Sequence, residues 1–154
     1  MTPSKACYDL IKQFEGFRSK AYLCPAGILT IGFGHTGTDV LPGMRVTEAQ
    51  ADELLKRDVA RFALIVEKAL TAKVSQGQFD ALVSFCFNTG PGKAGVKDGL
   101  ITLKNGNPPS LLRKTNSGDK LGAAAEFDKW TKANGQELRG LVARREAEQR
   151  MYLS

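Results

Sequence analysis

Three residues, Glu15, Cys24 and Thr30, carry side chains that could perform acid–base chemistry at a single bond. Eight residues separate the glutamate from the cysteine, and five separate the cysteine from the threonine. A carboxyl group can protonate a leaving oxygen, while a thiolate and a hydroxyl can deprotonate or hold water on the opposite side of the bond. The pattern therefore predicts a hydrolytic site, if the surrounding elements bring the three groups together.

The first of these elements is a predicted helix that places Glu15 at its C-terminal end. Ser4 can cap this helix and Gly16 can end it. A general acid must keep its proton near neutral pH, which burial and the negative end of a helix dipole favour and a nearby arginine opposes. The apolar residues of the helix recur at intervals of three and four: Cys7, Leu10, Ile11 and Phe14.

The second element is a predicted β-hairpin over residues 22–35. A Pro-Ala-Gly sequence at 25–27 supplies its turn, and apolar residues alternate with polar or small ones in the second strand. Thr30 falls on the polar side of this strand together with Gly32 and Gly34. Such glycines either let a bulky group approach the chain or mark a bulge or tight bend.

The rest of the chain is predicted to be helical. Capping signals at Thr47 and Ser75 begin two helices, of which the first is long and the second is apolar nearly all round and therefore buried. Shorter helices are expected at about 95–104, 109–116 and 119–132, and a final one at 137–152.

The composition is that of one globular domain. With 154 residues, 42% of them hydrophobic and 25% charged, the chain can bury a sizeable core. No apolar run approaches the ~20 residues of a membrane span, and no secretory signal is visible at the N-terminus. The net charge of +6 favours an anionic partner, which could be nucleic acid, an acidic cell wall or a lipid surface.

The three cysteines have no metal-ligand spacing, so neither a metal nor a cofactor is expected. Cys7 and Cys86 lie on apolar helical faces and are interpreted as small core residues. Cys24 differs from both because it lies in a Pro-Gly turn.

The candidate residues resemble the active-site pattern of the phage-type lysozymes, the endolysins of glycoside hydrolase family 24. That pattern is Glu, eight residues, Asp or Cys, five residues, Thr, and then Ile-Gly-x-Gly-His. It is met here by Glu15, Cys24, Thr30 and residues 31–35.

Two further segments extend the resemblance over nearly the whole chain. Residues 78–90 look like the central helix of the family, and Trp130 with residues 140–146 looks like its C-terminal part. The chief departure from the best-known members is the cysteine at position 24, where they carry aspartate.

The resemblance implies an α+β, lysozyme-like fold in a single domain of residues 1–154. A small β-containing lobe of about residues 15–46 would be joined by a connecting helix, about 47–70, to a mainly helical lobe. The helical lobe would consist of residues 1–14 and 71–154.

The resemblance also implies hydrolysis of the β-1,4 bond between N-acetylmuramic acid and N-acetylglucosamine in bacterial peptidoglycan. Glu15 would be the general acid. In an inverting reaction Cys24 and Thr30 position and deprotonate a water molecule, whereas in a retaining reaction the Cys24 thiolate attacks the sugar carbon. The inverting reaction is preferred, because Thr30 has little to do if sulfur occupies the place of the water.

Three more residues match family positions that line the sugar groove: Thr36, Phe87 and Asn88. An aromatic ring and an amide suit the apolar faces and N-acetyl groups of sugars. Either Arg144 or Arg145 could be the neighbour of Glu15.

The remaining polar features have structural interpretations. His35, the only histidine, is expected to be a hydrogen-bonded scaffold residue. The basic C-terminal helix is expected to dock on the helical bundle with a solvated charged face, or alternatively to make weak contact with anionic envelope polymers. Its arginines are Arg139, Arg144, Arg145 and Arg150.

We therefore expect a monomeric endolysin that acts on bacterial peptidoglycan without stable membrane insertion. It would stay in the host cytoplasm until a holin opens the inner membrane and lets it reach the periplasm and cell wall. A non-catalytic peptidoglycan-binding module of the same fold is the main alternative. A nucleic-acid-binding protein is a weaker one, since no helix-turn-helix or aromatic-basic sheet pattern is present.

Overall fold

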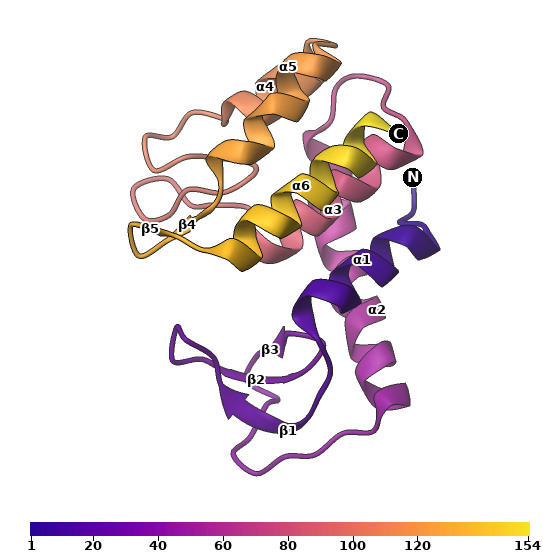
Figure 1. Cartoon of the computed structure of the whole chain (residues 1–154), viewed down its shortest axis with the longest axis vertical. Coiled ribbons are helices and arrows are strands. Elements are labelled where there is room, and N and C mark those ends of the chain that lie inside the picture. The colour runs from indigo at the N-terminus through magenta and orange to yellow at the C-terminus, as the bar shows by residue number, and fades with distance from the viewer.

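The computed structural model describes residues 1–154, which form a small antiparallel sheet beside a larger group of helices (Figure 1). The predicted α+β class is confirmed. In chain order the elements are α1 (Lys5–Glu15), β1 (Arg18–Leu23), β2 (Leu29–Gly32), β3 (His35–Thr36), α2 (Glu48–Ala69), α3 (Gln76–Thr89), α4 (Ser110–Asn116), α5 (Lys120–Glu126), the 3-10 turn η1 (Phe127–Lys129), β4 (Lys132–Ala133), β5 (Gln136–Glu137) and α6 (Arg139–Leu153).

Helix α1 ends at Glu15, as predicted, because Gly16 leaves the helical conformation with φ +70°. The chain then enters a sheet with the order β1-β2-β3. This sheet is larger than the predicted hairpin, since β1 begins at Arg18 and β3 adds a third strand. Thr30 of β2 lies opposite Tyr22 on one side and Thr36 on the other, so the side chains of these three residues share a face of the sheet.

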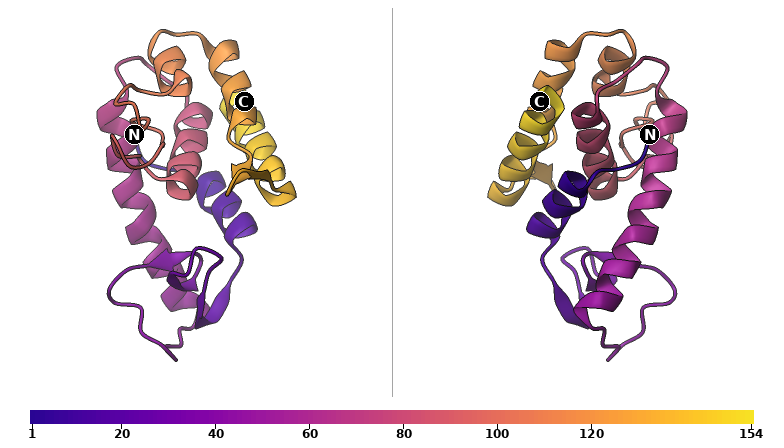
Figure 2. Two further views of the ribbon diagram at one scale, coloured as in Figure 1. Left: turned by 90° about the vertical axis from the view of Figure 1, so that its left-hand side faces the viewer. Right: turned by 90° about the vertical axis from the view of Figure 1, so that its right-hand side faces the viewer.

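Helix α2 runs from beside the sheet into the group of helices (Figure 2). It begins with the predicted capping box, in which the Thr47 side chain accepts from the Gln50 amide and the Gln50 side chain accepts from the Thr47 amide. Its residue Leu54 is buried in a small cluster with Ile31 of β2, whereas Ala63 and Val66 are buried in the larger core. One helix therefore packs in both parts of the molecule.

Helix α3 is the centre of the helical part. Every residue from Phe79 to Cys86 is buried, as its apolar composition predicts. Helices α1, α2 and α6 pack against it. Cys7 and Cys86 are free and fully buried, which confirms their interpretation as core residues.

Two segments differ from the predicted helices. Residues 93–104 form turns rather than a helix, because the amides of Leu100 and Ile101 donate to the carbonyls of Gly90 and Pro91 and fold the segment back onto the end of α3. The helix predicted at about 119–132 ends earlier, at Glu126, and η1 follows it. Residues 132–137 then form the β4–β5 hairpin, where Asn134 and Gly135 both adopt positive φ, with values of 52° and 77°. None of the helices combines the length and apolarity that crossing a membrane requires.

Candidate active site

Glu15 is fixed at the end of α1 by an arginine and by a glycine. Its Oε2 accepts from Nη1 of Arg144 at 3.0 Å, and the Arg144 side chain is buried while that of Glu15 is 21% exposed. Its other oxygen faces Gly34, where an added Cβ would lie 2.5 Å from Oε1. The backbone after β2 is therefore bare where the carboxylate approaches it, and this carboxylate is the bulky group that Gly34 admits.

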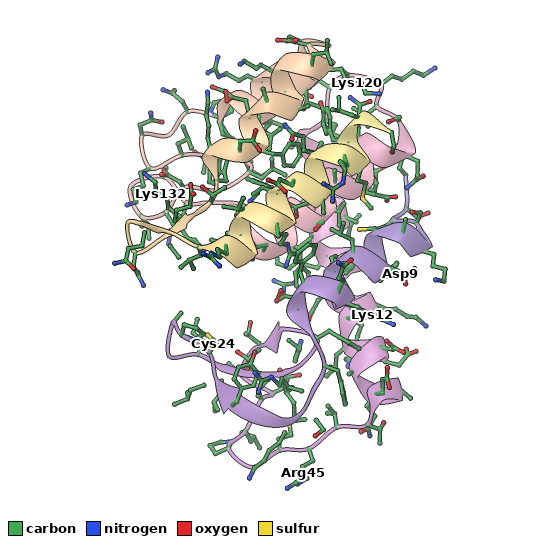
Figure 3. The ribbon with its side chains drawn as sticks, viewed as in Figure 1. Asp9, Lys12, Cys24, Arg45, Lys120 and Lys132 are labelled. Atoms are coloured by element: carbon green, nitrogen blue, oxygen red, sulfur yellow. The ribbon has the colours of Figure 1, made fainter.

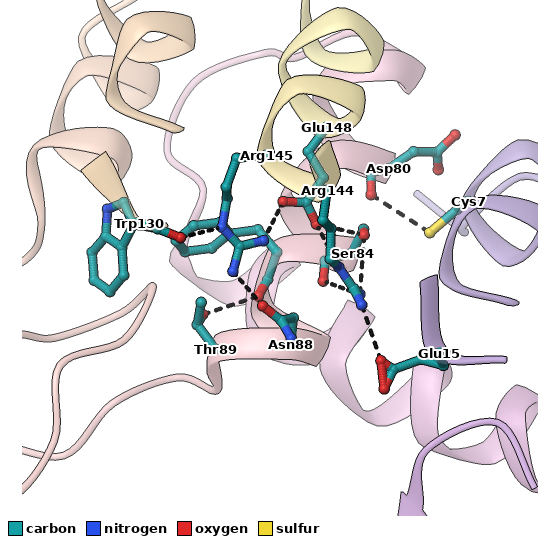
Figure 4. A network of polar contacts seen from close by, with 11 residues as sticks. Cys7, Glu15, Asp80, Ser84, Asn88, Thr89, Trp130, Arg144, Arg145 and Glu148 are labelled. Atoms are coloured by element: carbon teal, nitrogen blue, oxygen red, sulfur yellow. Dashed lines mark hydrogen bonds and ion pairs between the residues drawn. The ribbon is translucent and has the colours of Figure 1, made fainter. Parts of the chain in front are cut away.

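Arg144 is the arginine beside Glu15, and Arg145 points elsewhere (Figure 4). Nη2 of Arg145 donates to Oδ1 of Asn88, and its Nε donates to the carbonyl oxygen of Trp130 at 2.8 Å. Two adjacent arginines of α6 thus serve two different polar groups.

Glu148 holds both arginines in place. This carboxylate is fully buried and accepts from Arg144 Nε at 3.3 Å and from Arg145 Nη1 at 2.5 Å. The Ser84 hydroxyl donates to it at 2.6 Å. Buried charges need such partners because desolvation is costly, so the network is a rigid support behind Glu15.

Cys24 lies near the tip of the β1–β2 loop (Figure 3) and is partly exposed. Its amide donates to the Ile28 carbonyl at 3.0 Å, and its carbonyl accepts from the Gly27 amide at 2.8 Å. The pKa of the thiol is lowered, chiefly because the Ile28 backbone hydrogen-bonds to the sulfur. Burial raises this pKa, whereas hydrogen bonds from the Ala26 backbone and the Thr30 hydroxyl lower it further. The turn therefore stabilises the thiolate relative to that of an ordinary cysteine.

Thr30 lies next to this turn and is only 4% exposed. Its hydroxyl donates to the Ile28 carbonyl oxygen at 2.9 Å. The hydroxyl lowers the Cys24 pKa only when it rotates and donates the same hydrogen to the sulfur instead. With its hydrogen on Ile28, the Thr30 oxygen is left as an acceptor, which suits it to hold one hydrogen of a water molecule.

The three predicted binding residues lie in different environments. Thr36 is exposed on β3, directly opposite Thr30. Phe87 is half-buried, and its ring packs edge-on against Phe62 with centroids 5.5 Å apart, so it also supports the core. Asn88 is half-buried and bound by Arg145.

His35 is hydrogen-bonded on both ring nitrogens, as its structural interpretation predicts. Nδ1 lies 2.7 Å from Asp58 of α2, and Nε2 lies 3.0 Å from Asp39. Burial lowers the pKa of His35, but hydrogen bonds and charge from the two aspartates outweigh it, so the net pKa is raised.

Sequence reasoning did not identify Glu148, Ser84 or Asp58 as parts of these networks. Glu148 carried a readable signal, because it follows Arg144 by four residues and Arg145 by three, the spacing of side-chain pairs on one helix. Ser84 and Asp58 carried none, since their partners are far away in the sequence.

A small antiparallel sheet, a helix that links it to a helical part, and a glutamate at the end of α1 together define a lysozyme-like protein. The family model described as phage lysozyme matches residues 12–148. The chain therefore belongs to the phage lysozyme family, and the resemblance seen in the sequence is confirmed.

Individual relatives agree with this assignment. An endolysin of Bacillus phage B103 is 43% identical over the whole chain and 55% of its own length. An endolysin of Acyrthosiphon pisum secondary endosymbiont phage 1 is 38% identical, with 94% of this chain and 93% of the relative covered. The solved muramidase domain of SpmX from Asticaccaulis excentricus superposes with a TM-score of 0.81 at 37% identity, covering 98% of this chain and 97% of that one.

The chain spans about half the length of the Bacillus phage relatives that it matches. The lysozyme-like fold predicted from the sequence is confirmed by the solved structure.

Proposed function

We propose that the protein is a muramidase that hydrolyses the β-1,4 bond between N-acetylmuramic acid and N-acetylglucosamine in bacterial peptidoglycan. The observation that carries this proposal is the fixed position of Glu15, with Arg144 on one carboxylate oxygen and Gly34 against the other. Preorganised placement of a catalytic group is a major source of rate enhancement.

In the proposed reaction Glu15 acts as the general acid. It donates its proton to the glycosidic oxygen as the bond from that oxygen to the anomeric carbon breaks. A water molecule attacks the same carbon from the opposite face and gives its proton to the Cys24 thiolate. Thr30 accepts the other hydrogen of the water and so orients its lone pair toward the sugar.

The lowered pKa of Cys24 supports this role, because the base must be deprotonated to accept a proton. The stereochemical outcome would be inversion. Attack of the thiolate on the anomeric carbon, with retention, is the alternative. It leaves the position of Thr30, beside the Cys24 turn, without a function.

The glycan would contact Thr36, Phe87 and Asn88. Thr36 shares a face of the sheet with Thr30. Asn88 connects to Glu15 through Arg145, Glu148 and Arg144. An aromatic edge and polar groups suit the mixed apolar and polar surface of a sugar chain.

Release of soluble muropeptides from purified peptidoglycan, identified by mass analysis, tests the function. Wild-type protein should release fragments in which one water has been added per bond cleaved. Glu15→Gln should reduce release at least a thousandfold, on the order of the loss when an essential acid–base group is removed. Glu53→Gln, an exposed glutamate paired with Lys56 on α2, is the matched control and should behave as wild type.

The non-catalytic alternative predicts a different result from the same material. If wild-type protein sediments with peptidoglycan but releases nothing, the chain is a binding module rather than an enzyme. Residual release by Glu15→Gln close to that of wild type would remove Glu15 from its proposed role.

We further propose that the chain works as a monomeric endolysin with one domain. Its β-containing lobe would be about residues 15–46, its connecting helix about 47–70, and its helical lobe residues 1–14 with 71–154. It would act on the cell wall of a host after a holin opens the inner membrane, with no cofactor and no nucleic-acid partner. Sedimentation of the purified protein, and lysis on expression with and without a holin, test these points.

A further inference from the structure

The network behind Glu15 has a second arm that ends at Asn88. We propose that Arg145 is a positioning residue, which fixes the Asn88 amide so that its nitrogen donates to the N-acetyl carbonyl of the glycan. This inference rests on the proposed function, in which Asn88 contacts peptidoglycan.

Arg145 is held on three sides before it reaches Asn88. Its side chain is 1% exposed, Nε donates to the Trp130 carbonyl, and Nη1 donates to Glu148. Its guanidinium also stacks over the Phe85 ring at 4.8 Å from the centroid. Because the guanidinium is planar, these contacts also fix the orientation of Nη2, which donates to Asn88 (Figure 4).

The chemistry of arginine decides which end of the amide faces it. A guanidinium only donates hydrogen bonds, so the amide oxygen of Asn88 must point toward Arg145 and the amide nitrogen must point away. The nitrogen has no protein partner and is not among the buried unsatisfied atoms, so it is reachable from solvent. Asn88 therefore presents two N–H donors and no free carbonyl.

Glu148 connects this donor to the proposed acid. It binds Arg144, which binds Glu15, and it binds Arg145, which binds Asn88. One buried carboxylate thus sets the positions of both groups relative to each other. A sugar whose N-acetyl carbonyl accepts from Asn88 is thereby held in a fixed register with respect to Glu15.

The first experiment measures the preference for N-acetylated glycan. Binding of a tetrasaccharide of alternating N-acetylglucosamine and N-acetylmuramic acid is compared with its de-N-acetylated form by calorimetry, with Glu15→Gln added to each protein so that the glycan is not cleaved. Wild type should prefer the acetylated form by about tenfold, the value of one good hydrogen bond. Asn88→Asp should lose this preference, because its carboxylate pairs with Arg145 but has no N–H to offer.

Asn88→Asp separates the inference from loss of folding, since a carboxylate beside Arg145 should preserve or raise the melting temperature. Asn105→Asp is the matched control. Asn105 lies in an exposed turn where its side-chain oxygen accepts from the Asn107 amide, a role that aspartate retains. It should bind as wild type does.

The second experiment tests Arg145 itself through kinetics. Arg145→Lys keeps the charge beside Glu148 but loses the planar fork that bonds Trp130, Glu148 and Asn88 at once, so KM should rise about tenfold with little change in kcat. Because Arg145 acts through Asn88, adding Arg145→Lys to Asn88→Ala should raise KM no further. Arg150→Lys, at an exposed position of α6, is the control.

The outcomes are distinct. A full N-acetyl preference in Asn88→Asp, or additive KM effects in the double variant, would overturn the inference. If Arg145→Lys does not fold, Asn88→Gln replaces it, because the longer side chain keeps the amide but not its fixed position and should lose the preference. If wild type prefers the N-acetylated glycan but does not hydrolyse peptidoglycan, the proposed function alone is refuted. If wild type hydrolyses peptidoglycan and Asn88→Asp keeps the N-acetyl preference, this inference alone is refuted.

Discussion

At the scale of single residues, Gly34 leaves the space that the Glu15 carboxylate occupies. The absence of a side chain at position 34 lets the Glu15 carboxylate lie against the backbone, where a Cβ would come within 2.5 Å of Oε1 and 3.0 Å of Cδ. Contacts this short do not occur, so any larger residue must displace the carboxyl group or the turn after β2.

We predict that Gly34→Ala lowers the rate of peptidoglycan hydrolysis by about a hundredfold, because displacement of a catalytic group by about 1 Å has an effect of this size. The matched control is Gly43→Ala, which has a similar positive φ of 79° but nothing within 4 Å of the added Cβ. Both variants should lose about 1–2 kcal/mol of stability from the left-handed backbone conformation. Equal activities in the two variants would contradict the role assigned to Gly34.

Cys24 leads to a prediction about pH. Because the thiolate is the active base, the hydrolysis rate of wild type relative to that of Cys24→Asp should increase as the pH rises through the Cys24 pKa, which lies below the ordinary value of 9.0. Both proteins share Glu15 as the acid, and the aspartate of the variant is already ionised above about pH 5, so only the thiol changes this ratio. Rate–pH profiles of the two proteins check this.

Thiol alkylation gives an independent control for the same residue. It should inactivate wild type but not Cys24→Asp, because Cys7 and Cys86 are buried and burial raises the pKa of each to about 12. Full activity of Cys24→Ser would show that the thiol takes no part in the reaction.

The sequence contains part of this residue-level site but not all of it. The types and spacing of Glu15, Cys24 and Thr30 are readable directly. The sequence does not show whether Arg144 or Arg145 lies beside Glu15. Neighbouring helical residues point about 100° apart, and the sequence does not fix the rotation of α6. The catalytic roles themselves stay predictions.

At the scale of elements, His35 links the sheet to α2. It bridges Asp58 on α2 and Asp39 in the loop after β3, and Gly34 immediately precedes it. The raised pKa of His35 means that the folded state binds its proton more tightly than the unfolded state. This bridge therefore stabilises the protein fully below the unfolded pKa of about 6.5 and loses that contribution as pH rises through the higher, folded pKa.

Asp58→Asn should accordingly lower the melting temperature by several degrees at pH 5.5 and by much less at pH 9. The amide can still hydrogen-bond to the neutral ring, but it cannot pair with the charged one. Asp9→Asn removes an exposed aspartate whose partner is Lys5 at 2.6 Å, and it should have a small effect at both pH values. If Asp58→Asn lowers the melting temperature equally at pH 5.5 and pH 9, this account is contradicted.

Elements with strong local signals were predictable, and those set by distant contacts were not. The capping boxes at Thr47 and Ser75 placed the starts of α2 and α3 to the residue. The turns of residues 93–104 depend on backbone hydrogen bonds to Gly90 and Pro91, which no periodicity encodes. The β4–β5 hairpin did have a local signal, the Asn-Gly pair at 134–135, whose positive φ values fit a tight hairpin turn.

At the scale of the whole molecule, the position of the positive charge differs from the predicted basic helix. Arg144 and Arg145 are buried and paired with Glu15 and Glu148, so these four groups cancel. The net charge of +6 is therefore carried by the other ionisable residues of the chain. Any contact of α6 with an anionic envelope would have to use the exposed Arg139 and Arg150.

This distribution predicts that salt affects association with the cell wall more than it affects the chemistry. Charges on the surface are screened over about 10 Å at 0.1 M salt and about 3 Å at 1 M, whereas buried pairs are screened much less. Hydrolysis of intact, anionic peptidoglycan should therefore fall about tenfold between about 0.05 and 0.5 M sodium chloride, because electrostatic attraction raises encounter rates by at least that factor. Cleavage or binding of an uncharged N-acetylglucosamine oligomer should change little over the same range. If salt suppressed both substrates equally, the effect would lie in the site itself, and the surface charge would have no part in recognition of the wall.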